Sequence, residues 1–197
     1  MAQYLPRVVN EDLASRLVAG RYLDTGESVF DRSYNTTGVA STTQVLTLMG
    51  FRALKTEAIT RVQVYTGGTA AGATPTLCRI AVYQRQTANA WGLVVSHAND
   101  TTLFAAANTT YTKTFTTTFN KVAGADYAVG ILIVSAAAFP TFIAPHASAS
   151  TGFTTDALTA QPLVFGKVTA QADLATSYTS ANVVASQTGH FHATLLN

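Results

Sequence analysis

The most constraining feature of this chain is a run of threonines that alternates with aromatic residues between Tyr111 and Phe119. Successive side chains of a β-strand point to opposite faces, so this run predicts a strand with one aromatic and one hydroxyl face. Threonine is β-branched and suits a half-exposed, pleated surface. After a turn that contains Gly124, residues 126–134 are apolar at odd and even positions, which predicts a strand buried on both faces. We expect these two strands to form an antiparallel pair, with 126–134 near the middle of a β-sandwich.

Other short apolar segments, separated by turn-rich stretches, predict further strands. Their spacing is typical of a jelly roll or a related sandwich. We therefore predict an all-β fold, a jelly-roll-like antiparallel β-sandwich over residues 41–197, with Leu103 and Phe104 plugging its core from a loop. The expected strands are 45–51, 59–66, 77–85, 93–98, 163–168 and 189–196. The residues expected to be buried on the apolar strand faces are Cys78, Ile80, Val82, Phe115, Phe119, Val129 and Ile131.

Residues 1–40 differ from the rest of the chain and hold five of its ten acidic residues. Asn10 can cap a short helix that ends at Gly20. The segment has too few periodic apolar positions to build a core of its own. We expect an extended N-terminal arm, carrying this short helix, that docks on a neighbouring protein or on the chain's own sandwich. A plain flexible terminus is the alternative. The expected partner-docking residues are Leu13, Leu17, Tyr22, Phe30 and Tyr34.

Charged residues make up only 11% of the chain, and its net charge is +2. Surfaces rich in Thr, Ser, Ala and Gly cost little to desolvate, which suits a protein that sits among copies of itself or other chains. Nucleic-acid binding needs a cluster of Lys and Arg, and the sequence has no basic run, so we expect no nucleic-acid partner. The uncharged stretch 127–145 is long enough to cross a bilayer. It is interrupted by Gly130 and Pro140, so we expect no membrane insertion.

A His-x-His pair, His190 and His192, is the one candidate for a metal site. Residues two apart on a strand share a face, so both imidazoles could reach one ion. Further ligands would have to come from elsewhere in the chain or from symmetry-related copies, as around the axis of a trimer. We favour the alternative of two surface histidines that flank an inward-facing Phe191, and we expect no metal and no cofactor.

Candidates for ligand binding and catalysis are few. Trp91, in an expected turn, could stack on a sugar ring or could instead pin the turn to the core. His97 and Asp100 lie near serines and threonines, but no Gly-x-Ser-x-Gly elbow accompanies them. A pair of carboxylates of the glycosidase kind needs only two acids brought together in space. The single cysteine, Cys78, is expected to be a buried thiol rather than a nucleophile. We assign no catalytic residue and do not expect an enzyme.

Three segments between Ile59 and Pro145 resemble a module of structural proteins from tailed bacteriophages, especially those of actinobacterial hosts. The segments read TGGTAAGATPTLCR at 66–79, ANDTTLFAAANT at 98–109 and YAVGILIV at 127–134. The resemblance covers a little under half of the chain and carries no catalytic signature, so no functional residue transfers. The arm lies outside it.

This resemblance implies a structural protein located in the virion. The expected role is a minor tail or baseplate component that could bind glycans of the host surface. A capsid decoration protein or head fibre is the alternative, and a carbohydrate-active enzyme is a more remote one. The expected partners are copies of the chain itself, as a trimer, and other virion proteins.

Overall fold

A computed structural model describes residues 35–53, 55–72, 74–87, 90–136, 139–145, 165–185 and 191–197 of the chain. In this part the fold is all-β, and its one helical element is a single 3-10 turn, η3 (Ser180–Asn182). None of the described helical segments is long and apolar enough to cross a membrane. The strands are β1 (Asn35–Ala40), β2 (Leu46–Arg52), β3 (Glu57–Tyr65), β4 (Leu77–Thr87), β5 (Ala90–Ser96), β6 (Thr110–Lys121), β7 (Asp126–Val134), β8 (Thr141–Pro145), β9 (Phe165–Val168), β10 (Ser177–Thr179), β11 (Val184–Ala185) and β12 (Ala193–Leu196).

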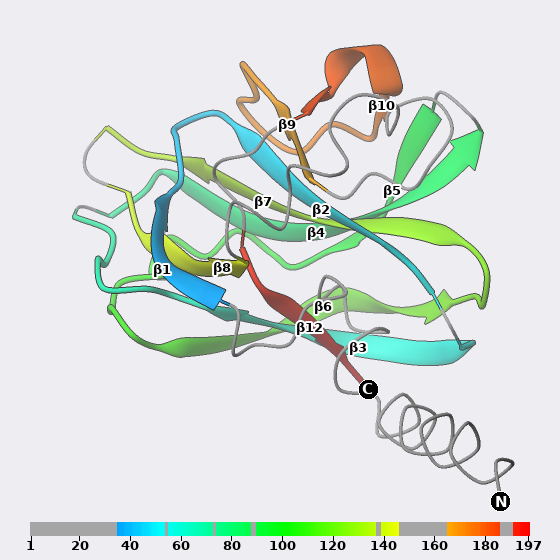
Figure 1. Ribbon diagram of the computed structural model, residues 1–197, viewed down its shortest axis with the longest axis horizontal. Helices are drawn as coiled ribbons and strands as arrows, with labels where there is room; N and C mark the ends of the chain where they lie inside the picture. Colours follow the sequence, from blue (N-terminus) through cyan, green and yellow to red (C-terminus); the bar gives the residue numbers. More distant parts are fainter. Residues whose placement is uncertain are drawn as a thin grey trace, which may run out of the picture.

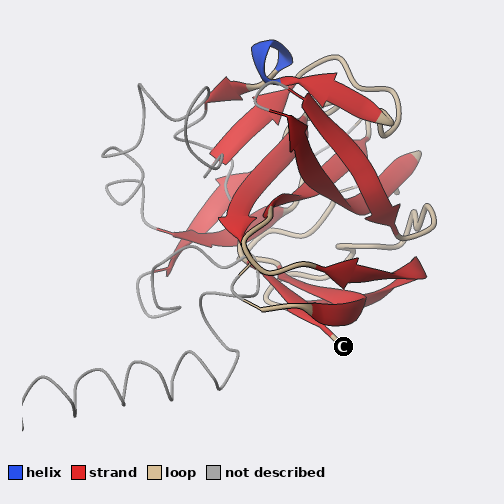
Figure 2. Cartoon of the chain, turned by 90° about the vertical axis from the view of Figure 1, so that its right-hand side faces the viewer, coloured by secondary structure: helices blue, strands red, loops and turns tan. Residues whose placement is uncertain are grey.

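The strands form antiparallel sheets. A seven-stranded sheet, the large sheet, has the order β10-β5-β4-β7-β2-β9-β11, and a three-stranded sheet, the small sheet, has the order β12-β3-β6. Strands β1 and β8 form a separate pair. Figures 1 and 2 show the small sheet as a layer below the central strands of the large sheet. The described part of the chain is therefore sandwich-like.

The main core lies between the two layers. Alternate residues of β4 and β7 enter it from the large sheet, and residues of β3 and β6 enter it from the small sheet. Each of the residues that the sequence predicts to be buried is at most 5% exposed, which confirms that prediction. Leu103 and Phe104 also lie in this core, as expected.

A second core lies on the opposite face of the large sheet. The two ends of that sheet, β10 and β11, are joined through η3 and Val183 alone, so the sheet curls around this face. Figure 1 shows β9, β10 and η3 above the central strands. Strands β2, β4 and β7 are thus covered on both sides, which confirms the prediction for 126–134. The buried residues of this core are Leu46, Leu48, Ala81, Tyr83, Trp91, Ala128, Leu132, Val168, Tyr178 and Val183.

The predicted pairing of 111–119 with 126–134 is wrong. Strand β6 pairs with β3 in the small sheet, whereas β7 lies between β4 and β2 in the large sheet. The turn at 122–125 carries the chain from one layer to the other, and the rings of Phe119 and Tyr127 meet across the core at 5.9 Å. The two strands need different surroundings. Strand β6 leaves its hydroxyl face in water, whereas β7 is apolar on both faces and must be covered on both, so β7 fits the interior of the large sheet and β6 fits the small sheet.

The remaining predicted strands correspond to β2, β3, β4, β5, β9 and β12, with shifted ends. Residues 35–40, the last part of the predicted arm, form β1 and pair with β8, so they belong to the fold. The predicted helix after Asn10 and the docking residues Leu13, Leu17, Tyr22, Phe30 and Tyr34 lie outside the described residues.

Candidate functional site

Loops that are distant in sequence meet at one end of the sandwich. The amide of Thr66 donates to the carbonyl of Thr109 at 3.0 Å, and the amide of Asn108 donates to the carbonyl of Gly67 at 2.8 Å. The amide of Gly67 in turn donates to the carbonyl of Thr141 at 2.7 Å. The glycine-rich loop, residues 66–76, is therefore tied to loop 97–109 and to the start of β8.

Phe104 anchors loop 97–109 in the main core. Its ring meets Phe142 and Tyr111 edge to face, with centroids 4.9 Å and 5.3 Å apart. Phe104 has a φ of 69°, a left-handed conformation that is unfavourable for a bulky side chain. Complete burial of the ring holds the backbone in this conformation. The loop is thus a packed structure rather than a plain connection.

The carboxylate of Asp100 fastens the same loop to β6. One oxygen, Oδ1, accepts from the amide of Thr102 at 2.9 Å and from its hydroxyl at 2.6 Å. The other oxygen, Oδ2, pairs with the ammonium of Lys113 on β6. Hydrogen bonds from Lys113 and Thr102 hold the pKa of Asp100 well below its usual range, so this carboxylate is ionised at all ordinary pH values.

A pocket of about 290 Å³ lies between the two loops. Its walls are small apolar and hydroxyl side chains, contributed by Ala71, Thr74, Pro75, Thr101, Thr102, Leu103 and Ala105. These lining residues include no acid, base or aromatic ring, so they supply no group for proton transfer and no platform for a sugar.

His97 and Asp100, which the sequence places close together, do not form a catalytic pair. Asp100 is engaged by Lys113 and Thr102, and neither ring nitrogen of His97 has a hydrogen-bond partner among the described residues. His97 is also only 2% exposed, so it does not lie on the surface.

His192 is buried as well, so the predicted surface position of this residue is wrong. Its ring packs against Tyr65 with centroids 5.3 Å apart, and its amide donates to the carbonyl of Ile143 at 2.8 Å. The inward position of Phe191 is confirmed, whereas His190 lies outside the described residues. The described residues contain no cluster of three or more His, Cys, Asp or Glu side chains suited to a metal ion.

Trp91 lies on β5 rather than in a turn, and that prediction is wrong. It pairs with Tyr178 of β10 and is 3% exposed, so its ring packs in the second core and offers no face to a sugar. A register shift between β4 and β5 leaves Val94 without a partner. This bulge turns Trp91 and Leu93 toward the second core and Val95 toward the main core.

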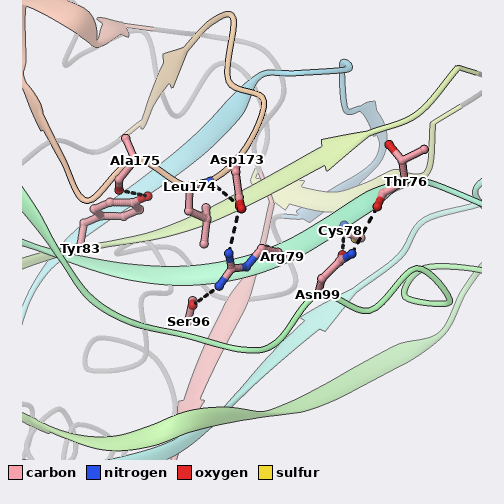
Figure 3. Close-up of polar contacts among 9 residues, drawn as sticks. All are labelled: Thr76, Cys78, Arg79, Tyr83, Ser96, Asn99, Asp173, Leu174 and Ala175. Atoms are coloured by element: carbon pink, nitrogen blue, oxygen red, sulfur yellow. Dashed lines mark hydrogen bonds and ion pairs between the residues drawn. The ribbon is translucent and has the colours of Figure 1, made fainter.

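Sequence patterns gave no element for residues 169–176, yet this segment is held firmly over the second core (Figure 3). Arg79 of β4 donates to Asp173 at 3.0 Å and to the hydroxyl of Ser96 at 2.8 Å. The hydroxyl of Tyr83 donates to the carbonyl of Ala175 at 3.1 Å. The signal in the sequence is a charged and a phenolic residue in the otherwise apolar first part of β4, residues 77–83, each of which needs a polar partner.

Figure 3 also shows Asn99, whose side-chain amide ties the loop after β5 to the start of β4. Its oxygen accepts from the amide of Cys78 at 2.8 Å, and its nitrogen donates to the carbonyl of Thr76 at 3.2 Å. The thiol of Cys78 is buried in the main core, as expected, and burial raises its pKa to about 12. A protonated, buried thiol is not a nucleophile at neutral pH.

The outer face of the small sheet is the second candidate surface. Thr112, Thr114 and Thr118 of β6 are exposed, so the predicted hydroxyl face is present in part. Thr116 is exposed as well, but its hydroxyl donates to the carbonyl of Ser96 at 2.9 Å, and the register of β6 with β3 shifts beyond Thr114. On the neighbouring β3, the side-chain amide of Gln63 donates to the hydroxyl of Thr112 at 3.1 Å. The result is a set of exposed hydroxyl groups on the sheet, with one charged neighbour, Arg61 of β3, opposite Thr114. Such a surface suits contact with another protein, because its groups lose little hydration on burial.

Comparison with known proteins found no matching protein family and no matching curated protein.

Proposed function

We propose that the chain is a structural protein of a tailed-bacteriophage virion, a minor tail or baseplate component that assembles with copies of itself and with other virion proteins. Its fold would be a jelly-roll-like sandwich, and residues 1–34 would be the arm that anchors it to the particle. The loop end would face outward, away from the arm, and could contact glycans of the host surface.

One observation carries this proposal. The segments 66–79 and 98–109, which resemble the phage module, are distant in sequence but hydrogen-bonded to each other through Thr66, Gly67, Asn108 and Thr109. The two loop sequences that resemble the phage module thus pack against each other as one structural unit. The exposed threonines of β6 support the proposal further, because hydroxyl groups cost less to desolvate than charged ones and so suit lasting contact with neighbouring chains.

The arm is proposed as the anchor because of its large apolar residues. Each large apolar side chain buried on a partner contributes roughly 1.5–3 kcal/mol, whereas ordering the backbone costs about 1–2 kcal/mol per residue. Several buried anchors together with hydrogen bonds to the partner are therefore needed. A segment of this composition gains stability only by lying across another surface.

Deletion of residues 1–34 tests the proposal, because it removes the arm and keeps β1 paired with β8. The full chain and the truncated chain are expressed, each with a tag, during infection by a phage that encodes this chain. We expect the full chain to sediment with purified particles and the truncated chain to stay soluble, folded and unincorporated. Equal incorporation would refute the anchor role, and absence of the full chain from particles would refute the virion role.

A further inference from the structure

His97 occupies an unusual position where β5 ends and loop 97–109 begins. The side chain is 2% exposed, and both of its ring nitrogens lack a hydrogen-bond partner among the described residues. Buried polar groups in folded proteins are nearly always hydrogen-bonded, so such a histidine calls for a physical explanation. A neutral imidazole tolerates this site far better than a charged one, because an ion without a partner is costly to bury.

Three charged groups act on His97 from the elements around it. They are Arg79 on β4, Asp100 in the loop and Lys113 on β6. The one anion, Asp100, is already bound by Lys113 and Thr102. The thiol of Cys78, on the same face of β4 as Ile80, stays protonated. An imidazolium at His97 would therefore have no free acceptor from these groups.

Two main-chain hydrogen bonds attach residues 97–100 to β4, and the side chain of Asn99 adds two more at the start of that strand. The amide of His97 donates to the carbonyl of Ile80 at 3.0 Å, and the amide of Asp100 donates to the carbonyl of Cys78 at 3.2 Å. Strand β5, in contrast, is held on both sides, by β4 and by β10. Movement of His97 toward water would thus disturb the loop before it disturbs the sheet.

We propose that His97 is a pH switch, whose protonation in acid releases loop 97–109 and the pocket beside it while the two sheets stay folded. The release exposes Leu103 and Phe104, which seal this end of the main core at neutral pH. The loop end of the molecule thereby has a closed form at neutral pH and an open form in acid.

The direction of the pH dependence follows from the burial of His97. Burial lowers the pKa of His97 below its ordinary value, and the cations Lys113 and Arg79 act in the same direction, whereas the residue's own main chain and Asp100 act in the opposite direction. The open form, in which His97 meets water, has the ordinary pKa of about 6.5. Below that value the open form binds a proton that the closed form does not, so the closed form loses stability as the pH falls.

Hydrogen–deuterium exchange of the full chain tests the proposed pH switch, with protection factors compared at about pH 7.5 and about pH 5. On acidification we expect protection in 97–109 to fall by about tenfold or more, while the central strand β7 keeps its protection. The variant His97→Leu should lose this response, and the control His192→Phe, which keeps a ring against Tyr65, should retain it. Unchanged loop protection in acid, an equal loss in β7, or a response that persists in His97→Leu would each overturn the proposal.

A second readout decides the matter should His97→Leu fail to fold. The Cε1 proton of His97 is followed by NMR in the wild type and in Lys113→Met. We expect a titration midpoint below about 6.5 in the wild type and a higher midpoint in Lys113→Met, because the variant loses a cation and frees the carboxylate of Asp100. A titration midpoint of His97 at or above the ordinary value, or one that Lys113→Met leaves unchanged, would contradict the proposed pH switch.

Discussion

The ion pair between Glu57 and Lys121 gives the sharpest test of the packing between β3 and β6. The two residues are direct partners in the strand register, and Lys121 Nζ lies 2.8 Å from Glu57 Oε1. The Lys121 side chain is 0% exposed, whereas that of Glu57 is 17% exposed. Glu57→Gln keeps the shape of the side chain but removes the charge that faces the buried ammonium.

Removing one partner of a fully buried pair costs about 3–5 kcal/mol, and the partial exposure of Glu57 reduces our expectation to about 2–3 kcal/mol. With a urea m-value of about 2 kcal/mol/M, the unfolding midpoint should fall by about 1–1.5 M. Urea unfolding followed by circular dichroism measures this shift. The double variant Glu57→Gln/Lys121→Met should recover part of the loss, because it leaves no buried charge.

Lys55→Met is the matched control for that experiment. Lys55 pairs with the same carboxylate at 3.1 Å, but its side chain is 46% exposed. Exposed pairs contribute about 0–1 kcal/mol, so this variant should shift the midpoint little. Equal shifts for Glu57→Gln and Lys55→Met would refute the view that the buried ammonium depends on Glu57.

Two further predictions concern the main core. Ile131→Asp should abolish folding, because it places an unpaired carboxylate between the sheets. The control Thr114→Asp, on the exposed face of β6, should melt close to the wild type. A folded Ile131→Asp protein in thermal melts would refute the strand assignment. Cys78, whose pKa is raised to about 12 by burial, should resist a thiol reagent near neutral pH in the folded protein and react on unfolding in urea. Prompt labelling of the native chain would show that this thiol is not buried.

The sequence was sufficient to predict which strand faces are buried. Residues 126–134 are apolar in both phases, and that alone places β7 in the interior of a covered sheet. The alternation from Tyr111 to Phe119 places β6 at the surface in the same way. The partner strands were not predictable, because a short turn such as 122–125 can join strands of one sheet or of two. The difference between the two patterns favoured two sheets, and this signal was missed.

The positions of single polar and aromatic residues were the least predictable. Trp91 follows a turn-rich stretch, and its inward orientation depends on the bulge at Val94, which no local pattern marks. His192 is buried against Tyr65, which is far away in sequence, and His97 is buried at the end of β5, where no local pattern marks it as an interior residue. The pocket likewise depends on the contact between two loops, each of which reads as an ordinary turn-rich segment by itself.

The central claim is that this chain is a structural component of a phage particle, and its position on the particle tests that claim most directly. The measurement is electron microscopy of purified particles that carry a gold-labelled tag after Asn197. We expect the label at the tail tip or baseplate. Label on the head surface would replace the tail role by capsid decoration or a head fibre. Particles that lack the label, when the tagged chain is produced in the same cells, would contradict the claim.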